Sequence, residues 1–155
     1  MTSVQDPHEF VRFRDPNEAV GLAMRLIAGS APFDRLPLGL TGGLLISRID
    51  AGDYGFARRG DLAVGVVIWG FTTEEAAAGF IDRTRPLGSE DLGGGPAGLV
   101  FAFRAVDRAT TRFLVTRLRK AVFAGAKSLR FIRDYGPGAA GRKPRAVVMR
   151  RRAGL

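Results

Sequence analysis

Leu62-Ala-Val-Gly-Val-Val-Ile-Trp-Gly-Phe71 is the segment that decides the fold class of this chain. It is rich in β-branched residues, which favour a strand, and apolar residues occupy both of its faces. The residues that follow, Thr72-Thr-Glu-Glu-Ala-Ala-Ala78, combine a capping threonine with carboxylates at the positive end of a helix. A strand that is apolar on both faces needs cover on both, so the segment predicts a central strand with Trp69 largely buried.

The rest of the chain predicts further helices and strands around this one. Capping residues and apolar periodicity predict helices from residue 15 to near residue 29, over 38–49, from 73 onward and after Asp107. Apolar runs predict strands over residues 54–58, 99–103, 129–132 and 146–149. This order predicts a single-domain α/β (α+β) sandwich in which helices flank one mixed sheet.

Three parts are expected along the chain. Residues 1–14 form an N-terminal arm, although Phe10, Val11 and Phe13 could pack on the body. Residues 15–135 form the domain itself. Residues 136–155 form a basic C-terminal segment that contains a glycine-rich linker and a last strand.

Composition excludes several classes of function. At 155 residues and 46% hydrophobic content, the chain can build one core but not two. The absence of cysteine excludes disulfides and thiolate chemistry, and a single histidine, His8, excludes a multi-histidine metal cluster, so no metal is expected. No run approaches the roughly 18 apolar residues of a membrane span, and the N-terminus lacks signal-peptide order. A cytoplasmic protein is therefore expected.

The positive charge is a property of the C-terminal half. Residues 1–103 hold 9 Lys+Arg against 13 Asp+Glu, a net of −4, whereas residues 104–155 hold 15 against 2, a net of +13. Such a surface attracts acidic partners, and the alternative is a solvated helix face followed by a basic tail. Nucleic acid is not an expected partner, because exposed aromatic residues for base stacking are few and no binding module is recognisable. The residues expected to bind an acidic partner are Arg108, Arg112, Arg117, Arg119 and Lys120.

Two other features, the glycine triplet at residues 93–95 and His8, do not by themselves indicate a function. Gly93-Gly94-Gly95 lacks the lysine and serine or threonine of a P-loop, and no Gly-x-Gly-x-x-Gly opens a helix, so a flexible loop is the simpler interpretation. His8 is a candidate general base only if the arm folds over a cleft; otherwise it is an exposed or packed histidine.

Several short motifs occur in a consistent order along the chain. They are the turn Ala28-Gly-Ser-Ala-Pro-Phe-Asp-Arg35 with Pro37, Asp53-Tyr54, Gly65-x-x-x-Trp69, Thr72-Thr-Glu74, Glu90-Asp-Leu-Gly-Gly-Gly95 and residues 99–103. In this order they resemble the RTX toxin-activating lysine acyltransferases, small proteins with a GNAT-type acyltransferase fold, and the likeness covers roughly residues 18 to 133. The resemblance implies transfer of a fatty acyl group from acyl carrier protein to a lysine of a client protein or peptide. It also suggests a two-fold homodimer, and it implies no bound cofactor beyond the phosphopantetheine thioester of the donor.

The chain departs from this family at the reacting groups. Family members use a histidine three residues after the serine of the turn, and an aspartate in the later strand. Counting from Ser30 places Phe33 at the histidine, and the later strand has Ala102 at the aspartate. Neither side chain exchanges a proton. A one-residue shift offers Asp34 instead, a weak base for a lysine ammonium unless its pKa is raised.

The candidate site residues therefore carry alternatives. Ser30 and Asp34 are the candidate catalytic residues, or they cap the helices around the turn. Phe33, Trp69 and Arg104 are expected to contact the substrate or its acyl group; Arg104 binds a phosphopantetheine phosphate or pairs with Asp107. Glu90 and Asp91 line a cleft or are solvated loop residues. Two functions remain open: an acyltransferase, and a catalytically silent relative that binds an acyl carrier or a client.

Overall fold

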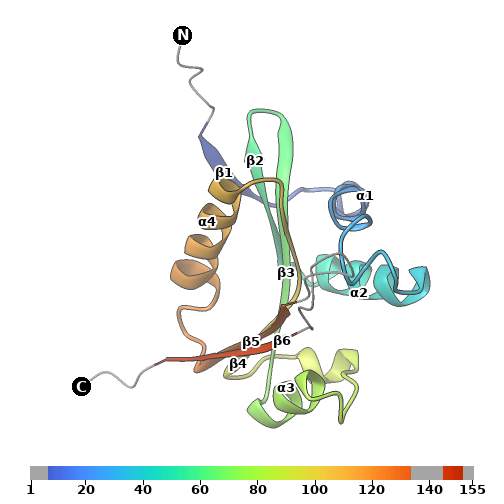
Figure 1. Cartoon of the computed structure of the whole chain (residues 1–155), viewed down its shortest axis with the longest axis vertical. Helices are drawn as coiled ribbons and strands as arrows, with labels where there is room; N and C mark the ends of the chain where they lie inside the picture. Colours follow the sequence, from blue (N-terminus) through green and yellow to red (C-terminus); the bar gives the residue numbers. More distant parts are fainter. Residues whose placement is uncertain (1–6, 134–144, 152–155) are drawn as a thin grey trace.

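The structure is a computed structural model that describes residues 7–133 and 145–151 (Figure 1). Its six-stranded sheet has the order β1-β2-β3-β4-β5-β6, which places β3 inside the sheet as predicted. Only β4 and β5 are parallel; the other neighbours are antiparallel. The predicted mixed sheet is confirmed. The strands are β1 (His8–Val11), β2 (Tyr54–Arg59), β3 (Leu62–Thr72), β4 (Ala97–Ala105), β5 (Ser128–Arg133) and β6 (Arg145–Arg150).

Helices cover both faces of this sheet. On one side lie α1 (Pro16–Ile27), α2 (Leu38–Asp50) and α3 (Glu74–Ile81), and on the other lies α4 (Arg108–Arg117) (Figure 1). The caps are those expected from the sequence, since Asp15, Thr73 and Asp107 each accept a hydrogen bond from a backbone N–H of the first turn. A single π-turn, Leu118–Val122 (η2), extends α4, and a short 3₁₀ turn, Ser89–Leu92 (η1), interrupts the predicted glycine loop.

The two faces of β3 supply two separate cores. Val66 and Ile68 pack toward α1 and α2, while Val67 and Trp69 pack toward α4. Trp69 is 3% exposed, as predicted. The close approach of α4 explains the glycine at position 65: a Cβ there would lie 2.8 Å from Cγ2 of Thr110 and 2.9 Å from Cδ1 of Leu114.

Part of the predicted N-terminal arm belongs to the sheet. Residues 8–11 form the edge strand β1, which pairs with β2, and Phe13 follows it into the core. The phenol of Tyr54 accepts from the Phe13 N–H at 3.1 Å and donates to its carbonyl at 2.9 Å. The predicted last strand corresponds to β6, whereas the predicted linker 136–141 lies outside the described residues.

Phe56 is the side chain whose loss should cost most stability on the α1 side. It is fully buried, and its ring makes edge contacts with Phe13 and Tyr54 at centroid distances of 5.0 and 5.9 Å. We expect Phe56→Ala to lower the free energy of unfolding by about 3–5 kcal/mol, measured by urea denaturation. The control Leu62→Ala, on β3 and 70% exposed, should change it by less than about 0.5 kcal/mol. Equal losses would contradict this arrangement of the core.

Candidate functional site

β4 and β5 separate soon after they meet. Their ladder holds three residue pairs, from Ala97 with Ser128 to Leu99 with Arg130, although both strands run on. Beyond Leu99, the described part of β4 pairs only with β3. At the same point Val100 and Ala102 face consecutive residues of β3, so Phe101 is a bulge residue. A bulge bends its strand, which fits the divergence of the two strands here.

Polar contacts tie β5 to α3 and to the start of β4 below the point of separation. The Glu74 carboxylate, at the start of α3, accepts from the Ser128 hydroxyl at 2.8 Å and lies 3.3 Å from Nη2 of Arg130. The Lys127 N–H donates to the Pro96 carbonyl at 2.8 Å. On the opposite face Phe123 packs so closely that a Cβ at position 98 would lie 2.5 Å from its ring, which explains Gly98. The separation is therefore anchored on both faces of the sheet.

A cavity of about 420 Å³ occupies the opening between the strands. We call it the fork cavity. It passes through the sheet, because it is lined on one side by α4 and on the other by the turn between α1 and α2. Its lining residues are Ala31, Pro32, Phe33, Val100, Phe101, Ala102, Phe103, Thr111, Val115, Leu118, Arg119, Leu129, Phe131, Ile132 and Met149.

A second cavity, of about 540 Å³, adjoins the first. It lies between α2, α3 and the η1 loop, and we call it the α2–α3 cavity. The two cavities are neighbours, since both are lined by Pro32, Phe33, Val100, Phe101 and Ile132. We refer to the two together as the cleft; its lining is mostly apolar, and each cavity is of a size that suits a small-molecule ligand.

The α1–α2 turn brings one of the three predicted residues of this segment to the cleft. Phe33 lines both cavities. Ser30 and Asp34 line neither, and a backbone hydrogen bond from the Asp34 N–H to the Ser30 carbonyl, of 3.0 Å, closes the turn between them. The Asp34 carboxylate lies instead 3.4 Å from Nε of Arg35 at the surface.

The other residues predicted from the resemblance are dispersed. Trp69 is buried beside Phe123, at a centroid distance of 6.5 Å, and lines neither cavity. Arg104 is exposed and does not pair with Asp107, whose partner is Arg59. Asp91 is not simply solvated, since it accepts from the Gly88 N–H at 2.9 Å and from Arg85 at 2.7 Å.

The basic residues of α4 and its extension are all on the surface. They are Arg108, Arg112, Arg117, Arg119 and Lys120. Arg119 also lines the fork cavity, and Arg117 lies 5.3 Å above the ring of Phe10. The predicted positive face is therefore present and adjoins the cleft.

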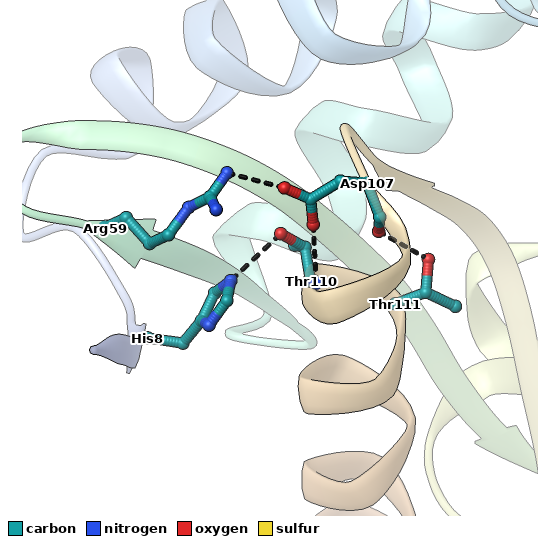
Figure 2. A network of polar contacts seen from close by, with 5 residues as sticks. All are labelled: His8, Arg59, Asp107, Thr110 and Thr111. Atoms are coloured by element: carbon teal, nitrogen blue, oxygen red, sulfur yellow. Dashed lines mark hydrogen bonds and ion pairs between the residues drawn. The ribbon is translucent and has the colours of Figure 1, made fainter. Parts of the chain in front are cut away.

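Asp107 occupies the N-terminus of α4 (Figure 2). Its carboxylate accepts from the Thr110 N–H at 2.8 Å and from Arg59 at 2.7 Å. These contacts lower the pKa of Asp107 from 3.8 to about 2, the hydrogen bonds from Thr110 contributing most. The end of a helix that ordinarily attracts anions thus already holds the protein's own carboxylate.

His8 belongs to the same network and not to the cleft. Its Nε2 is 3.0 Å from the Thr110 hydroxyl (Figure 2). Its ring also stacks on that of Phe113 at a centroid distance of 5.1 Å. It therefore ties β1 to α4, which is the packed alternative to the general-base role.

The walls of the cleft hold no proton acceptor among the described residues. Neither cavity is lined by histidine, aspartate or glutamate, and the ionisable lining groups are the guanidinium groups of Arg119 and Arg83. Over residues 7–133 and 145–151, no cluster of side chains could hold a metal ion, and no helix is long and apolar enough to cross a membrane. The site can bind and orient an apolar ligand.

Comparison with solved structures places the chain among GNAT-like folds. A GNAT-like decarboxylase, GphF, in complex with isobutyryl-CoA superposes with a TM-score of 0.55 at 13% identity, over 84% of this chain and 67% of that one. An apo mutant form of agmatine N-acetyltransferase superposes with a TM-score of 0.50 at 15% identity, over 82% and 76%. No family profile and no curated protein sequence matches the chain. At such identities the likeness establishes the GNAT-like fold, and the finer resemblance to toxin-activating enzymes is not among these findings.

The contacts of Asp107 should affect how the free energy of unfolding falls as the pH is lowered. A carboxyl group whose pKa is lowered by folding stabilises the native state above its unfolded pKa, and this contribution is lost as the pH falls toward the folded value. We expect Asp107→Asn, which retains a capping side chain, to lose less stability than the parent between pH about 4 and about 2. Urea midpoints across this range measure it, and parallel curves for the two proteins would refute the assignment.

Proposed function

We propose that this protein is a GNAT-type acyltransferase that binds a phosphopantetheine thioester in the fork cavity and passes the acyl group to a protein lysine. The observation that carries the proposal is the separation of β4 from β5. Beyond Leu99, β4 offers backbone N–H and carbonyl groups that no strand of the described residues pairs with on this side. An extended arm with amide groups, such as phosphopantetheine, can pair with such an edge as an added strand does.

The charges around the fork cavity favour a carrier protein over free coenzyme A as the donor. Arg119 lies at the cavity and further basic side chains of α4 adjoin it, which suits an acidic carrier. The pyrophosphate of free coenzyme A would require several anion-binding groups close together at the cavity. Thr111, in the first turn of α4, lines the cavity, yet the N-terminus of that helix is neutralised by Asp107. The exposed Arg104 remains a candidate for the single phosphate of the arm.

The reaction would be an aminolysis of the thioester. The neutral lysine amine attacks the carbonyl carbon, a C–N bond forms, the C–S bond breaks, and the amine proton leaves to solvent as the thiol departs. At pH 7, a lysine side chain with a pKa near 10.4 is neutral in only about one molecule in 2,500. Because the described walls lack a base, binding and orientation would have to supply most of the rate.

The lack of a base in the described cavity walls favours a second function. A relative that has lost its base can still bind an acylated carrier or a client protein through the same cleft and the same basic surface. In that case Phe33 occupies the place of the missing histidine as a packing residue of the cleft.

Phe33→His tests whether the cleft supports transfer. Because Phe33 lines both cavities, an imidazole there would supply the missing proton acceptor. We expect acylation of a lysine peptide, followed by intact mass with acyl carrier protein as donor, to rise by about 10² or more, with a pH midpoint near 6.5.

Two further variants serve as controls. Phe33→Gln should not raise the rate, since an amide does not titrate. Asp34→Asn should leave any parental transfer within about twofold, because Asp34 lies outside both cavities; a complete loss would restore Asp34 as the base. If neither the parent nor Phe33→His transfers while the carrier still binds, the silent binder is the better interpretation.

Carrier binding should depend on the charge of α4. We expect Arg112→Glu to slow association with acyl carrier protein about tenfold at low salt, whereas Arg25→Glu, an exposed change of equal charge on α1 at the opposite face, should have much less effect. In 1 M salt, where the Debye length is about 3 Å, the two variants should converge. Surface plasmon resonance at several salt concentrations measures this. Association that is independent of salt, or equal affinity for random DNA, would contradict a specific acidic partner.

A further inference from the structure

β6 forms an open edge of the sheet. It is the last strand in the order β1 to β6, and none of the described residues pairs with its outer side. Its six residues match six residues of β5 without a bulge, so the strand is regular over its whole length. All of them are exposed except Val147, which is half-buried. An exposed edge of this kind can pair with a further strand.

The register of β6 shows which of its backbone groups face outward. The Arg151 N–H, directly after the strand, donates to the Lys127 carbonyl at 3.0 Å. In an antiparallel ladder, alternate residues direct both their N–H and their carbonyl to the same neighbour. Counting back from Arg151 in steps of two, the intervening residues are Ala146, Val148 and Arg150. These three residues therefore direct their backbone groups to the outer edge.

The side chains along this edge are basic at both ends. Arg145 begins the strand and Arg150 ends it; both are exposed, and neither pairs with a carboxylate of the described residues. Val148 and Met149, which lie between them, are 42% and 43% exposed. The surrounding sequence adds to the charge, since residues 127–155 hold 9 Lys+Arg against 1 Asp+Glu. The edge thus combines free backbone groups with a positive charge that attracts carboxylates.

The same charges disfavour a second copy of β6 at this edge. If two copies of the strand pair antiparallel over their whole length, Arg145 of each lies opposite Arg150 of the other, and like charges directly opposite each other are destabilising. Charged edge residues commonly protect a protein from such self-association, but they give no protection against a strand of opposite charge. The other edge of the sheet differs, because Glu9 of β1 is already paired with Arg58.

We propose that the outer edge of β6 binds an extended acidic segment of another protein as an added antiparallel strand. The backbone groups of Ala146, Val148 and Arg150 pair with the segment, and its carboxylates lie opposite Arg145 and Arg150. A partner that presents only helices cannot use these backbone groups, so this surface is distinct from the basic face of α4. The inference does not rest on the proposed function, since it requires neither a thioester nor a transfer.

A short peptide tests strand addition directly. The probe is fluorescein-labelled Glu-Glu-Thr-Val-Thr-Val-Glu, which places glutamates opposite both ends of β6, and its binding to the full chain is followed by fluorescence anisotropy. The control Glu-Glu-Thr-Pro-Thr-Pro-Glu has the same charge but lacks two N–H groups that face β6, so it should bind at least tenfold more weakly. If the acidic peptide fails to bind, or the proline peptide binds equally well, the proposal is wrong.

Variants of β6 test the location. Val148→Pro removes an outward N–H, which an edge strand tolerates, and should weaken the acidic peptide at least tenfold; Val148→Thr keeps the N–H and should bind as the parent does. Arg150→Glu should weaken binding about tenfold at low salt, whereas Arg25→Glu, an equal change of charge on α1, should have much less effect. Parental affinity in both Val148→Pro and Arg150→Glu would refute this location.

Amide hydrogen exchange provides a measurement that needs no variant. Binding of the acidic peptide should slow the exchange of the Val148 amide, which faces outward, while the Val147 amide, which faces β5, should change little. NMR spectra of the full chain with and without the peptide resolve the two amides. Slowed exchange that is confined to α4 would overturn the proposal.

Other occupants of the edge predict different results. Random DNA or an anionic phosphatidylserine vesicle that displaces the labelled peptide as effectively as unlabelled peptide would identify a general surface for polyanions. A dimer that the acidic peptide does not dissociate, detected by sedimentation velocity, would identify a second copy of this chain. Either result would overturn the acidic segment as the occupant of β6.

Discussion

The short parallel ladder between β4 and β5 is the constraint on which the candidate site depends. Three residue pairs join the strands, and Glu74, Phe123 and the Pro96 carbonyl hold that region from both faces. Longer pairing would close the fork cavity and satisfy the backbone of β4. Because the strands separate at the Phe101 bulge, the sheet keeps an opening through its middle while β3 and its neighbours remain a continuous core.

The cleft combines good conditions for binding with poor conditions for proton transfer. Its walls are apolar, its mouth adjoins the positive face of α4, and its described lining has no carboxylate or imidazole. The ionisable groups that the sequence offered as bases lie elsewhere: Asp34 pairs with Arg35 at the surface, and His8 is held by Thr110. Under the function proposed above, a bound thioester would therefore react through orientation or through a group that a partner supplies.

Sequence reasoning was strongest where a pattern is local. The helix caps at Asp15, Thr73 and Asp107 and the apolar run of β3 can each be recognised from a few neighbouring residues. All four are present in the structure. It was weaker where a contact joins distant segments. Nothing near His8 signals an edge strand, because β1 exists only through its pairing with β2, some 50 residues away. The site residues divide in the same way, since the turn at residues 30–34 was located but only Phe33 of its three candidates faces the cleft.

The sequence alone is therefore sufficient to predict the helices α1 to α4, the strands other than β1, the burial of both faces of β3 and the basic character of α4. These follow from hydrophobic periodicity, capping and charge, which act over one or two turns of chain. Only the folded structure shows that β4 and β5 part after three pairs and that Phe33 and Phe101, far apart in the sequence, line the same two cavities. A cavity is the space that several distant elements leave between them, so no single stretch of sequence specifies it.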